Sequence, residues 1–172
     1  HAFLGEETGQ MGESDFLWII DPLDGTTNFL HNFPHFAVSI ALQHKGVLEQ
    51  AVIYDPLKQE LFTASKGKGA LLNNRKIRVS NKKTLDGALL GTGFPFNDEA
   101  AMISFIESFK ALFPAVAGIR RAGVASLDLA YVAAGRLDGF WEFNLKPWDI
   151  AAGALLVQEA GGVSAELTGR VD

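Results

Sequence analysis

The sequence contains no cysteine among its 172 residues. This absence excludes a disulfide framework, a thiol nucleophile and a zinc site with cysteine ligands. Any bound metal must therefore be held by oxygen or histidine ligands, which favours hard cations. Also missing is any apolar run of the roughly 20 residues that cross a bilayer, and the opening residues His1 to Leu4 lack the basic region of a signal peptide. We therefore expect a soluble protein of the cytoplasm with no membrane partner.

Positive charge is also scarce. Lys and Arg number 15 against 20 Asp and Glu, giving a net charge of -5, which argues against direct nucleic-acid binding through bulk charge. One segment departs from this balance, because seven Lys and Arg fall between Lys66 and Lys83. We interpret it as a solvated hairpin, and a nucleic-acid-binding patch is the alternative. With 48% hydrophobic and 20% charged residues, the remaining composition is that of a folded domain.

The first half of the chain has the pattern of an antiparallel sheet. The continuous apolar run Phe16 to Ile20 predicts a strand that is buried on both faces and ends at Asp21-Pro22. Three further strands, separated by turn signals, are predicted at residues 36–42, 47–54 and 60–64. Residues 66–79 predict an exposed hairpin. Because Ala2-Phe3-Leu4 already resembles a strand under way, we also expect an N-terminal segment to be missing.

After about residue 86 the pattern changes to alternating strands and helices, which is typical of α/β layering. Strands are predicted at residues 87–93, 116–119 and 137–143. Helices are predicted from Asn97-Asp98-Glu99 to Leu112, from Ala125 to Ala134 and from Pro147 to Gly161. We therefore predict two subdomains, residues 1–86 with the antiparallel sheet and metal-binding motif, and residues 87–172 with the α/β layers and the substrate side.

Two carboxylates follow the first buried strand, in the stretch Asp21-Pro22-Leu23-Asp24-Gly25-Thr26-Thr27-Asn28. A turn begun by Pro22 can bring Asp21 and Asp24 around one point, and acids so close repel each other unless a cation lies between them. Gly25 and the threonines suit a helix N-terminus, whose free N–H groups bind phosphate. Oxygen ligands suit Mg²⁺. The alternative is ordinary turn chemistry, with an Asx-turn followed by a threonine N-cap.

Two other acidic groups stand at the ends of predicted elements. Asp149 falls in the first turn of the last helix, where it could instead compensate the helix dipole, an effect of about 0.3–1 kcal/mol. Glu6 and Glu7 follow the first strand, where paired acids are more often solvated. Because ligands gather at such edges of open α/β sheets, the three acidic groups together favour a metal-dependent phosphate site.

Three motifs resemble the inositol monophosphatase family: WIIDPLDGTTNF (Trp18 to Phe29), PWDIAAG (Pro147 to Gly153) and GEET (Gly5 to Thr8). The resemblance covers essentially the whole chain and is greatest to the bacterial members, also called extragenic suppressor proteins. It implies an α+β fold, a layered αβαβα sandwich, with an antiparallel-sheet subdomain followed by an α/β subdomain with a mixed sheet. It also implies Mg²⁺-dependent hydrolysis of a phosphate monoester, by default myo-inositol 1-phosphate, with inhibition by lithium and a homodimer.

The resemblance also implies roles for individual residues. The implied metal ligands are Glu6, Asp21, the backbone carbonyl of Leu23, Asp24 and Asp149. The implied catalytic residues are Glu6 and Thr26, which orient and help deprotonate the attacking water, and Asp24. The implied substrate contacts are Leu23, Asp24, Gly25, Thr26, Arg120, Gly123, Val124, Ala125, Glu142 and Asp149. Within that set, backbone groups of Gly25 and Thr26 cradle the phosphate, and Glu142 contacts inositol hydroxyl groups.

The sequence departs from the family pattern in two respects. Val124 stands at a position that commonly carries a small hydroxyl residue, which would supply a hydrogen bond to substrate or water. The N-terminal helices of the family, and its last strand and helix, have no counterpart in the 172 residues. We therefore expect a chain truncated at both ends, whose working unit is longer and paired.

Two alternatives to inositol monophosphate hydrolysis stay open. Related phosphatases act on fructose 1,6-bisphosphate, histidinol phosphate, NADP or 3'-phosphoadenosine 5'-phosphate, and they share the metal motifs. Glu142, an acceptor for vicinal hydroxyl groups, favours a polyol among these substrates. The second alternative is a non-catalytic role with the transcription and ribosome-assembly machinery, for which Arg120 and Arg121 would form the surface.

Overall fold

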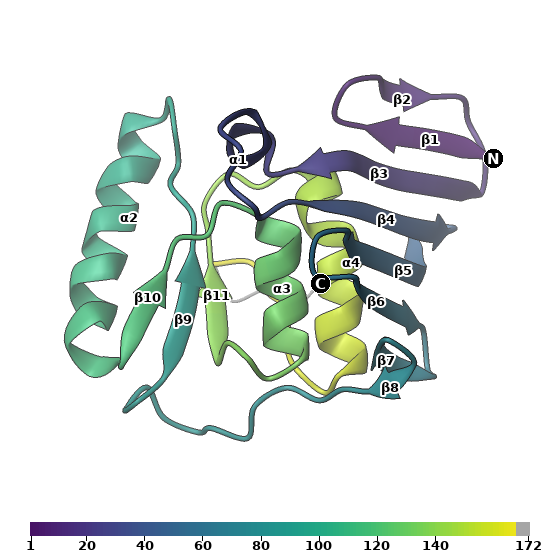
Figure 1. Cartoon of the computed structure of the whole chain (residues 1–172). Coiled ribbons are helices and arrows are strands. Elements are labelled where there is room, and N and C mark those ends of the chain that lie inside the picture. The colour runs from purple at the N-terminus through teal and green to yellow at the C-terminus, as the bar shows by residue number, and fades with distance from the viewer. Residues whose placement is uncertain (168–172) are drawn as a thin grey trace.

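The computed structural model describes residues 1–167, which fold into two sheets and a set of helices (Figure 1). The first half contains β1 (Ala2–Gly5), β2 (Gly9–Met11), β3 (Phe16–Asp24), α1 (Thr26–Leu30), β4 (Ala37–His44), β5 (Val47–Asp55), β6 (Glu60–Ser65), β7 (Gly69–Leu72) and β8 (Arg75–Lys76). The second half contains β9 (Leu89–Thr92), α2 (Glu99–Leu112), the 3-10 helix η1 (Phe113–Ala115), β10 (Gly118–Arg120), α3 (Ala125–Ala133), β11 (Gly139–Trp141) and α4 (Pro147–Glu159). The predicted strands and helices are present with shifted ends, and β2 is an addition.

The larger sheet has the strand order β2-β1-β3-β4-β5-β6-β7-β8. The predicted meander is confirmed, because β3 to β6 pair antiparallel in sequence order, and β7 and β8 form the predicted hairpin. Lys45 and Gly46 join β4 to β5 with φ of 49° and 82°, the positive values that tight hairpin turns require. One pairing differs from an antiparallel sheet, because β1 runs parallel to β3. The larger sheet is therefore mixed.

The strand β3 departs from its prediction in length and in burial. It does not end at Asp21-Pro22 but continues to Asp24, with a register shift against β4 between Asp21 and Asp24. Pro22 explains the shift, because it has no N–H for the ladder and is tolerated in a sheet at such irregularities. Burial on both faces is also wrong, since Phe16 is 36% exposed while Ile19 is buried. The irregular end of β3 is where the predicted metal motif lies.

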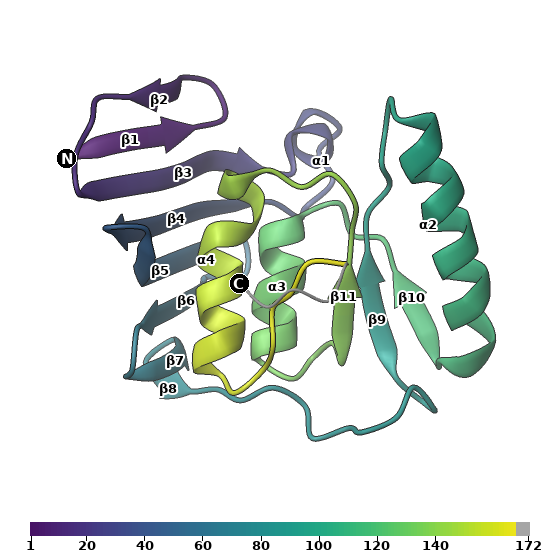
Figure 2. The same cartoon turned by 180° about the vertical axis from the view of Figure 1, so that it is seen from behind.

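The smaller sheet has the order β10-β9-β11, and both pairs are parallel. The prediction of a mixed sheet in this half is wrong for the described residues, where the mixed pairing belongs to the larger sheet. Figures 1 and 2 show α3 and α4 between the two sheets and α2 on the far side of the smaller one. The layers therefore alternate as sheet, helices, sheet and helix, which confirms the layered α+β fold class.

The helices α3 and α4 share one hydrophobic core with the larger sheet. Ile53 and Phe62 of the sheet are fully buried in one cluster with residues of both helices, including Leu156. Gly153 lets α3 and α4 approach closely, because a Cβ there would lie 2.5 Å from Leu129. The two halves thus meet in a common core, and their division at residue 86 stays a prediction. Within residues 1–167, no helix combines the length and the apolar character needed to cross a membrane.

Candidate functional site

Three aspartates meet where β3 ends and α4 begins. Asp21 and Asp24 lie at the C-terminal end of β3, and Asp149 lies in the first turn of α4. One carboxylate oxygen from each of the three lies within 4.8 Å of the other two. Asp21 and Asp24 are only 2% and 9% exposed. The fold therefore gathers two of the acidic motifs into one buried group, which we call the aspartate cluster.

Each carboxylate of the aspartate cluster is held in place by a backbone N–H. Asp21 Oδ1 accepts from Leu23 N at 3.1 Å, as in an Asx-turn. Asp24 Oδ2 accepts from Ser126 N at 2.8 Å, one of the free donors in the first turn of α3. Asp149 Oδ2 accepts from Lys146 N, the N-cap residue of α4, at 2.7 Å. The Asx-turn at Asp21 and the helix-start role of Asp149 are thus present, whereas the threonine N-cap is not, because Gly25 is the N-cap of α1 and no side chain caps that helix.

Ionisation of all three carboxyl groups in the aspartate cluster is unfavourable, because the groups are close together and largely buried. Burial, followed by repulsion from Asp24, raises the pKa of Asp21 to about 7. Burial also raises the pKa of Asp24 to about 6, although hydrogen bonds from Ser126 oppose the rise. The pKa of Asp149 is raised mainly by burial. A cation among these oxygens would remove the repulsion, and an all-carboxylate donor set fits a hard ion such as Mg²⁺.

Glu6 and Thr26, the proposed water-activating pair, lie next to the cluster without belonging to it. Glu6 is exposed in the turn after β1. Burial of part of its carboxyl group and repulsion from Asp149 raise its pKa, so the third acidic motif does face the same region. The hydroxyl of Thr26 donates to the carbonyl oxygen of Leu23 at 3.2 Å. The structure therefore places the pair near the cluster, and their roles stay a prediction.

A tight turn connects the aspartate cluster to the opposite wall of the site. Gly25 has a φ of 95° and precedes α1, and a Cβ on it would lie 2.8 Å from Cγ2 of Val124 and 3.2 Å from the carbonyl of His35. The side chain of Asn28 donates to the carbonyl oxygens of His35 and Ala122, both at 2.9 Å. The turn after β3 and the loop before α3 are thus locked together.

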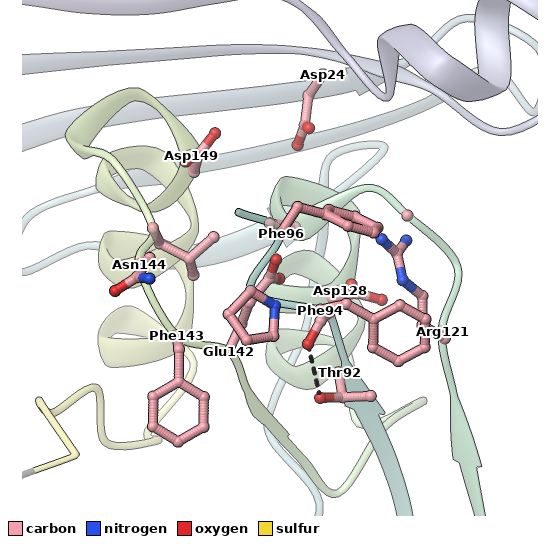
Figure 3. A pocket seen from close by; sticks show the side chains of 15 residues that line it. Asp24, Thr92, Phe94, Phe96, Arg121, Asp128, Glu142, Phe143, Asn144 and Asp149 are labelled. Atoms are coloured by element: carbon pink, nitrogen blue, oxygen red, sulfur yellow. Dashed lines mark hydrogen bonds between the residues drawn. The ribbon is translucent and has the colours of Figure 1, made fainter. Parts of the chain in front are cut away.

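A cavity of about 210 Å³ opens beside the cluster, and Figure 3 shows the side chains that line it. Asp24 and Asp149 of the aspartate cluster line it. Of the implied substrate contacts, Gly123, Ala125 and Glu142 also line it. Val124 does not line the cavity: it is fully buried, and it supports the turn at Gly25 instead.

The arginine of the cavity is Arg121 rather than Arg120. Arg120 is exposed on β10 and is not among the lining residues, whereas Arg121 is one of them. The guanidinium carbon of Arg121 lies 4.7 Å from the ring centre of Phe94 and 5.7 Å from that of Phe96, a stacked geometry that favours a cation over an aromatic face. Arg121 is therefore the arginine that lines the cavity, and the substrate contact of Arg120 stays a prediction.

Asp128 is a second cavity residue that sequence reasoning missed. It lies on α3, is 3% exposed and lines the cavity. Burial and repulsion from Glu142 raise its pKa to about 8, while Arg121 opposes the rise. The one signal in the sequence is that Asp128 is a single acid inside the apolar run Leu127 to Val132. A helical acid in such a run normally needs a partner.

The metal-free protein is expected to lose stability as the pH rises. The pKa of Asp21, Asp24, Asp128 and Glu142 is raised to about 7, 6, 8 and 7, from 3.8 for the aspartates and 4.5 for Glu142. Between about pH 4 and pH 8 the folded state therefore binds more protons than the unfolded state, so the free energy of unfolding falls with pH. Thermal denaturation in a chelator should show this fall. Mg²⁺ should oppose it most at high pH, and a midpoint that rises with pH would contradict the prediction.

Comparison with known proteins gives consistent matches. Residues 1–171 match the model of the inositol monophosphatase family. The chain is 62% identical to the Nus factor SuhB of Pseudomonas aeruginosa over 175 residues, which cover 98% of the chain and 65% of that protein. The solved structure of the extragenic suppressor protein suhB of Bartonella henselae has a TM-score of 0.91 at 50% identity, covering 95% of this chain and 64% of that one. The inositol monophosphatase of Anabaena (Nostoc) sp. PCC 7120 has a TM-score of 0.90 at 44% identity, covering all of this chain and 69% of that one. The chain thus spans about two thirds or less of the Pseudomonas and Bartonella proteins.

Proposed function

The chain belongs to the inositol monophosphatase family, and from this membership we propose that it serves the Mg²⁺-dependent hydrolysis of a phosphate monoester, with myo-inositol 1-phosphate as the preferred substrate. The observation that carries the proposal is that Asp24 and Asp149 of the aspartate cluster line the same cavity as Glu142. This supports a hard-ion site beside an acceptor for hydroxyl groups in one small polar cavity. That arrangement suits a polyol monophosphate.

In the proposed mechanism, the residues that would hold the metal are Asp21, Asp24, Asp149, Glu6 and the carbonyl of Leu23. A Mg²⁺ ion held there would supply positive charge for the phosphate oxygens and the leaving alkoxide, and a lower pKa for a bound water molecule. Glu6 and Thr26 would orient that water, and the carboxylate of Glu6 would accept its proton. The approach of Gly25 to Val124 fixes the turn from which the N–H groups of Gly25 and Thr26 would donate to the phosphate.

The leaving group is proposed to sit against Glu142 and the segment 123–125. Burial raises the pKa of Glu142 to about 7, with Arg121 opposing the rise, so this carboxyl group keeps both hydrogen-bond donor and acceptor capacity near neutral pH. A carboxyl group of this kind can bind two neighbouring hydroxyl groups of a polyol. The site therefore favours inositol over a leaving group without hydroxyl groups.

A phosphate-release panel tests the substrate assignment. The substrates are inositol 1-phosphate, fructose 1,6-bisphosphate, histidinol phosphate, NADP and 3'-phosphoadenosine 5'-phosphate, each with Mg²⁺ and with a chelator. We expect the highest kcat/KM for inositol 1-phosphate, no release in the chelator, and inhibition by lithium. A higher kcat/KM for another substrate would reassign the protein within the superfamily, and equal release with the chelator would refute metal dependence.

We also propose an oligomeric state and a location for the protein. Because the chain spans 65% of the length of the Pseudomonas relative, the activity and partners of a whole family protein come to it only as proposals. We propose a homodimer in the cytoplasm. Sedimentation of the purified chain with and without Mg²⁺ measures the assembly, and a monomer at micromolar concentration would overturn the dimer.

A second role is suggested by the name of the relatives, since the Pseudomonas protein is called a Nus factor. We propose that the chain also binds a component of the transcription or ribosome-assembly machinery without using its phosphatase chemistry. Arg120, exposed on β10 outside the cavity, is the candidate contact. In binding assays with purified RNA polymerase and transcription factors, Arg120→Ala should weaken binding, whereas Asp24→Asn should bind like the wild type. Equal loss in both variants would tie binding to the catalytic site instead.

A further inference from the structure

We propose that Asp128 contacts the substrate directly and selects leaving groups that carry a hydroxyl group where Asp128, Glu142 and Arg121 line the cavity. The inference deepens the proposed function and rests on it. It assigns a role to a buried acid that the proposed mechanism does not use. Figure 3 shows Asp128 on the same side of the cavity as Arg121, with Asp24 and Asp149 at the opposite end.

The carboxyl group of Asp128 differs from the other buried acids in its partners. Asp21 and Asp24 each accept from a backbone N–H, and Asp55 accepts from Leu57 N and from the backbone and side chain of Lys58. Within residues 1–167, no protein group donates a hydrogen bond to Asp128, although it is only 3% exposed. Buried polar groups nearly always have a partner. Because Asp128 lines the cavity, a ligand bound in the cavity can supply the missing hydrogen-bond partner.

The strand β9 runs beside the carboxyl groups of Asp128 and Glu142 and carries glycine next to each. Gly91 and Gly93 lie two residues apart on and just beyond β9 and so face the same side. A Cβ on Gly91 would crowd Cδ1 of Leu137 at 2.9 Å and would lie 3.4 Å from Oδ1 of Asp128, and a Cβ on Gly93 would overlap the carboxyl group of Glu142. Asp128 and Glu142 therefore stand side by side over the two glycines as a pair of hydrogen-bonding groups.

Arg121 completes this polar end of the cavity. It interacts electrostatically with both Asp128 and Glu142, and its guanidinium group is held over the rings of Phe94 and Phe96. Two carboxyl groups and one guanidinium group can satisfy several hydroxyl groups of one ligand, whichever protonation state Asp128 adopts. A leaving group without hydroxyl groups would leave these buried groups unpaired, and sites of this kind strongly reject such analogues.

The test compares two esters that differ only in hydroxyl groups on the ring, inositol 1-phosphate and cyclohexyl phosphate. Asp128→Ala should lower kcat/KM for inositol 1-phosphate by about 10-fold, the value of one hydrogen bond at the boundary between neutral and charged partners, and should leave cyclohexyl phosphate within about twofold of wild type. Asp128→Asn should be intermediate, because its amide still offers an acceptor. Asp86→Ala, the same change at an exposed aspartate, is the matched control.

Asp128→Asn keeps the size of this buried side chain, so it separates the loss of a carboxyl group from the loss of volume in Asp128→Ala, and thermal denaturation of both variants measures folding. If Asp128→Ala lowers kcat/KM equally for both esters, Asp128 is a structural residue and the proposal is overturned. An unchanged kcat/KM for both esters would also overturn it. If the wild type hydrolyses neither ester, the proposed function fails on its own. In that case, calorimetry measures the affinity of the wild type and of Asp128→Ala for inositol 1-phosphate. Equal affinities would show that Asp128 does not contact the substrate.

Discussion

Asp24→Asn is expected to abolish Mg²⁺-dependent release of phosphate from inositol 1-phosphate while the fold survives. Asparagine keeps the size of the side chain and an oxygen that can accept from Ser126 N, as Asp24 does at 2.8 Å. The variant loses one of the three carboxylates that meet within 4.8 Å, and a neutral amide is a much weaker ligand for a hard cation. Loss of one charge-stabilising group in an active site lowers the rate by about 10²- to 10³-fold. We expect at least that fall in kcat/KM.

The same variant should be at least as stable as the wild type without metal. Burial and repulsion from Asp149 and Glu6 raise the pKa of Asp24 to about 6, so above that pH the charge is unfavourable and its removal relieves the cluster. Mg²⁺ should raise the thermal midpoint of the wild type by several degrees and that of the variant much less. Asp86→Asn, which removes the same charge at an exposed position, should behave as wild type. Full activity in Asp24→Asn would refute the metal assignment.

The order of strands and helices was predictable because each signal is local. Lys45-Gly46 marks a hairpin turn by residue type, and Asp98 caps α2 by accepting from Ala101 N at 2.9 Å, as its position before an apolar helix predicts. The pairing of strands distant in the sequence was not predictable in this way. An apolar strand such as β1 carries no mark of the neighbour it will join or of its direction, and its parallel pairing with β3 emerged only from the structure.

The aspartate cluster was partly predictable and the far wall of the cavity was not. Asp21 and Asp24 are close in the sequence, so a turn suffices to join them, whereas Asp149 meets them only because α4 packs on the larger sheet. Of the two adjacent arginines, Arg121 lines the cavity and Arg120 is exposed, because successive residues of an extended chain point to opposite sides; residue type alone does not distinguish them. Asp128 was missed because its surroundings in the sequence are those of a core helix.

Gly25→Ala is expected to cause the largest loss of stability of any single change near the site. With a φ of 95°, Gly25 occupies a region that costs other residues about 1–3 kcal/mol, and an added Cβ would lie 2.8 Å from Cγ2 of Val124. The turn carries Asp24 on one side and Thr26 on the other, so activity should fall with stability. Thermal denaturation and phosphate release measure the two effects.

A double-mutant cycle separates backbone strain from crowding at this turn. Gly46→Ala changes a glycine with a φ of 82° and no neighbouring atom within 4 Å of the added Cβ, so it reports strain alone. Val124→Ala removes the methyl group that a Cβ on Gly25 would strike, and in the Gly25→Ala background it should restore about 0.5–3 kcal/mol relative to the sum of the single changes. Strict additivity, or a Gly46→Ala variant as unstable as Gly25→Ala, would show that the approach to Val124 does not hold the turn. The expected non-additive free energy would instead show that the buried side chain of Val124 sets the position of Gly25. Gly25 would then link the turn that carries Asp24 to the loop before α3.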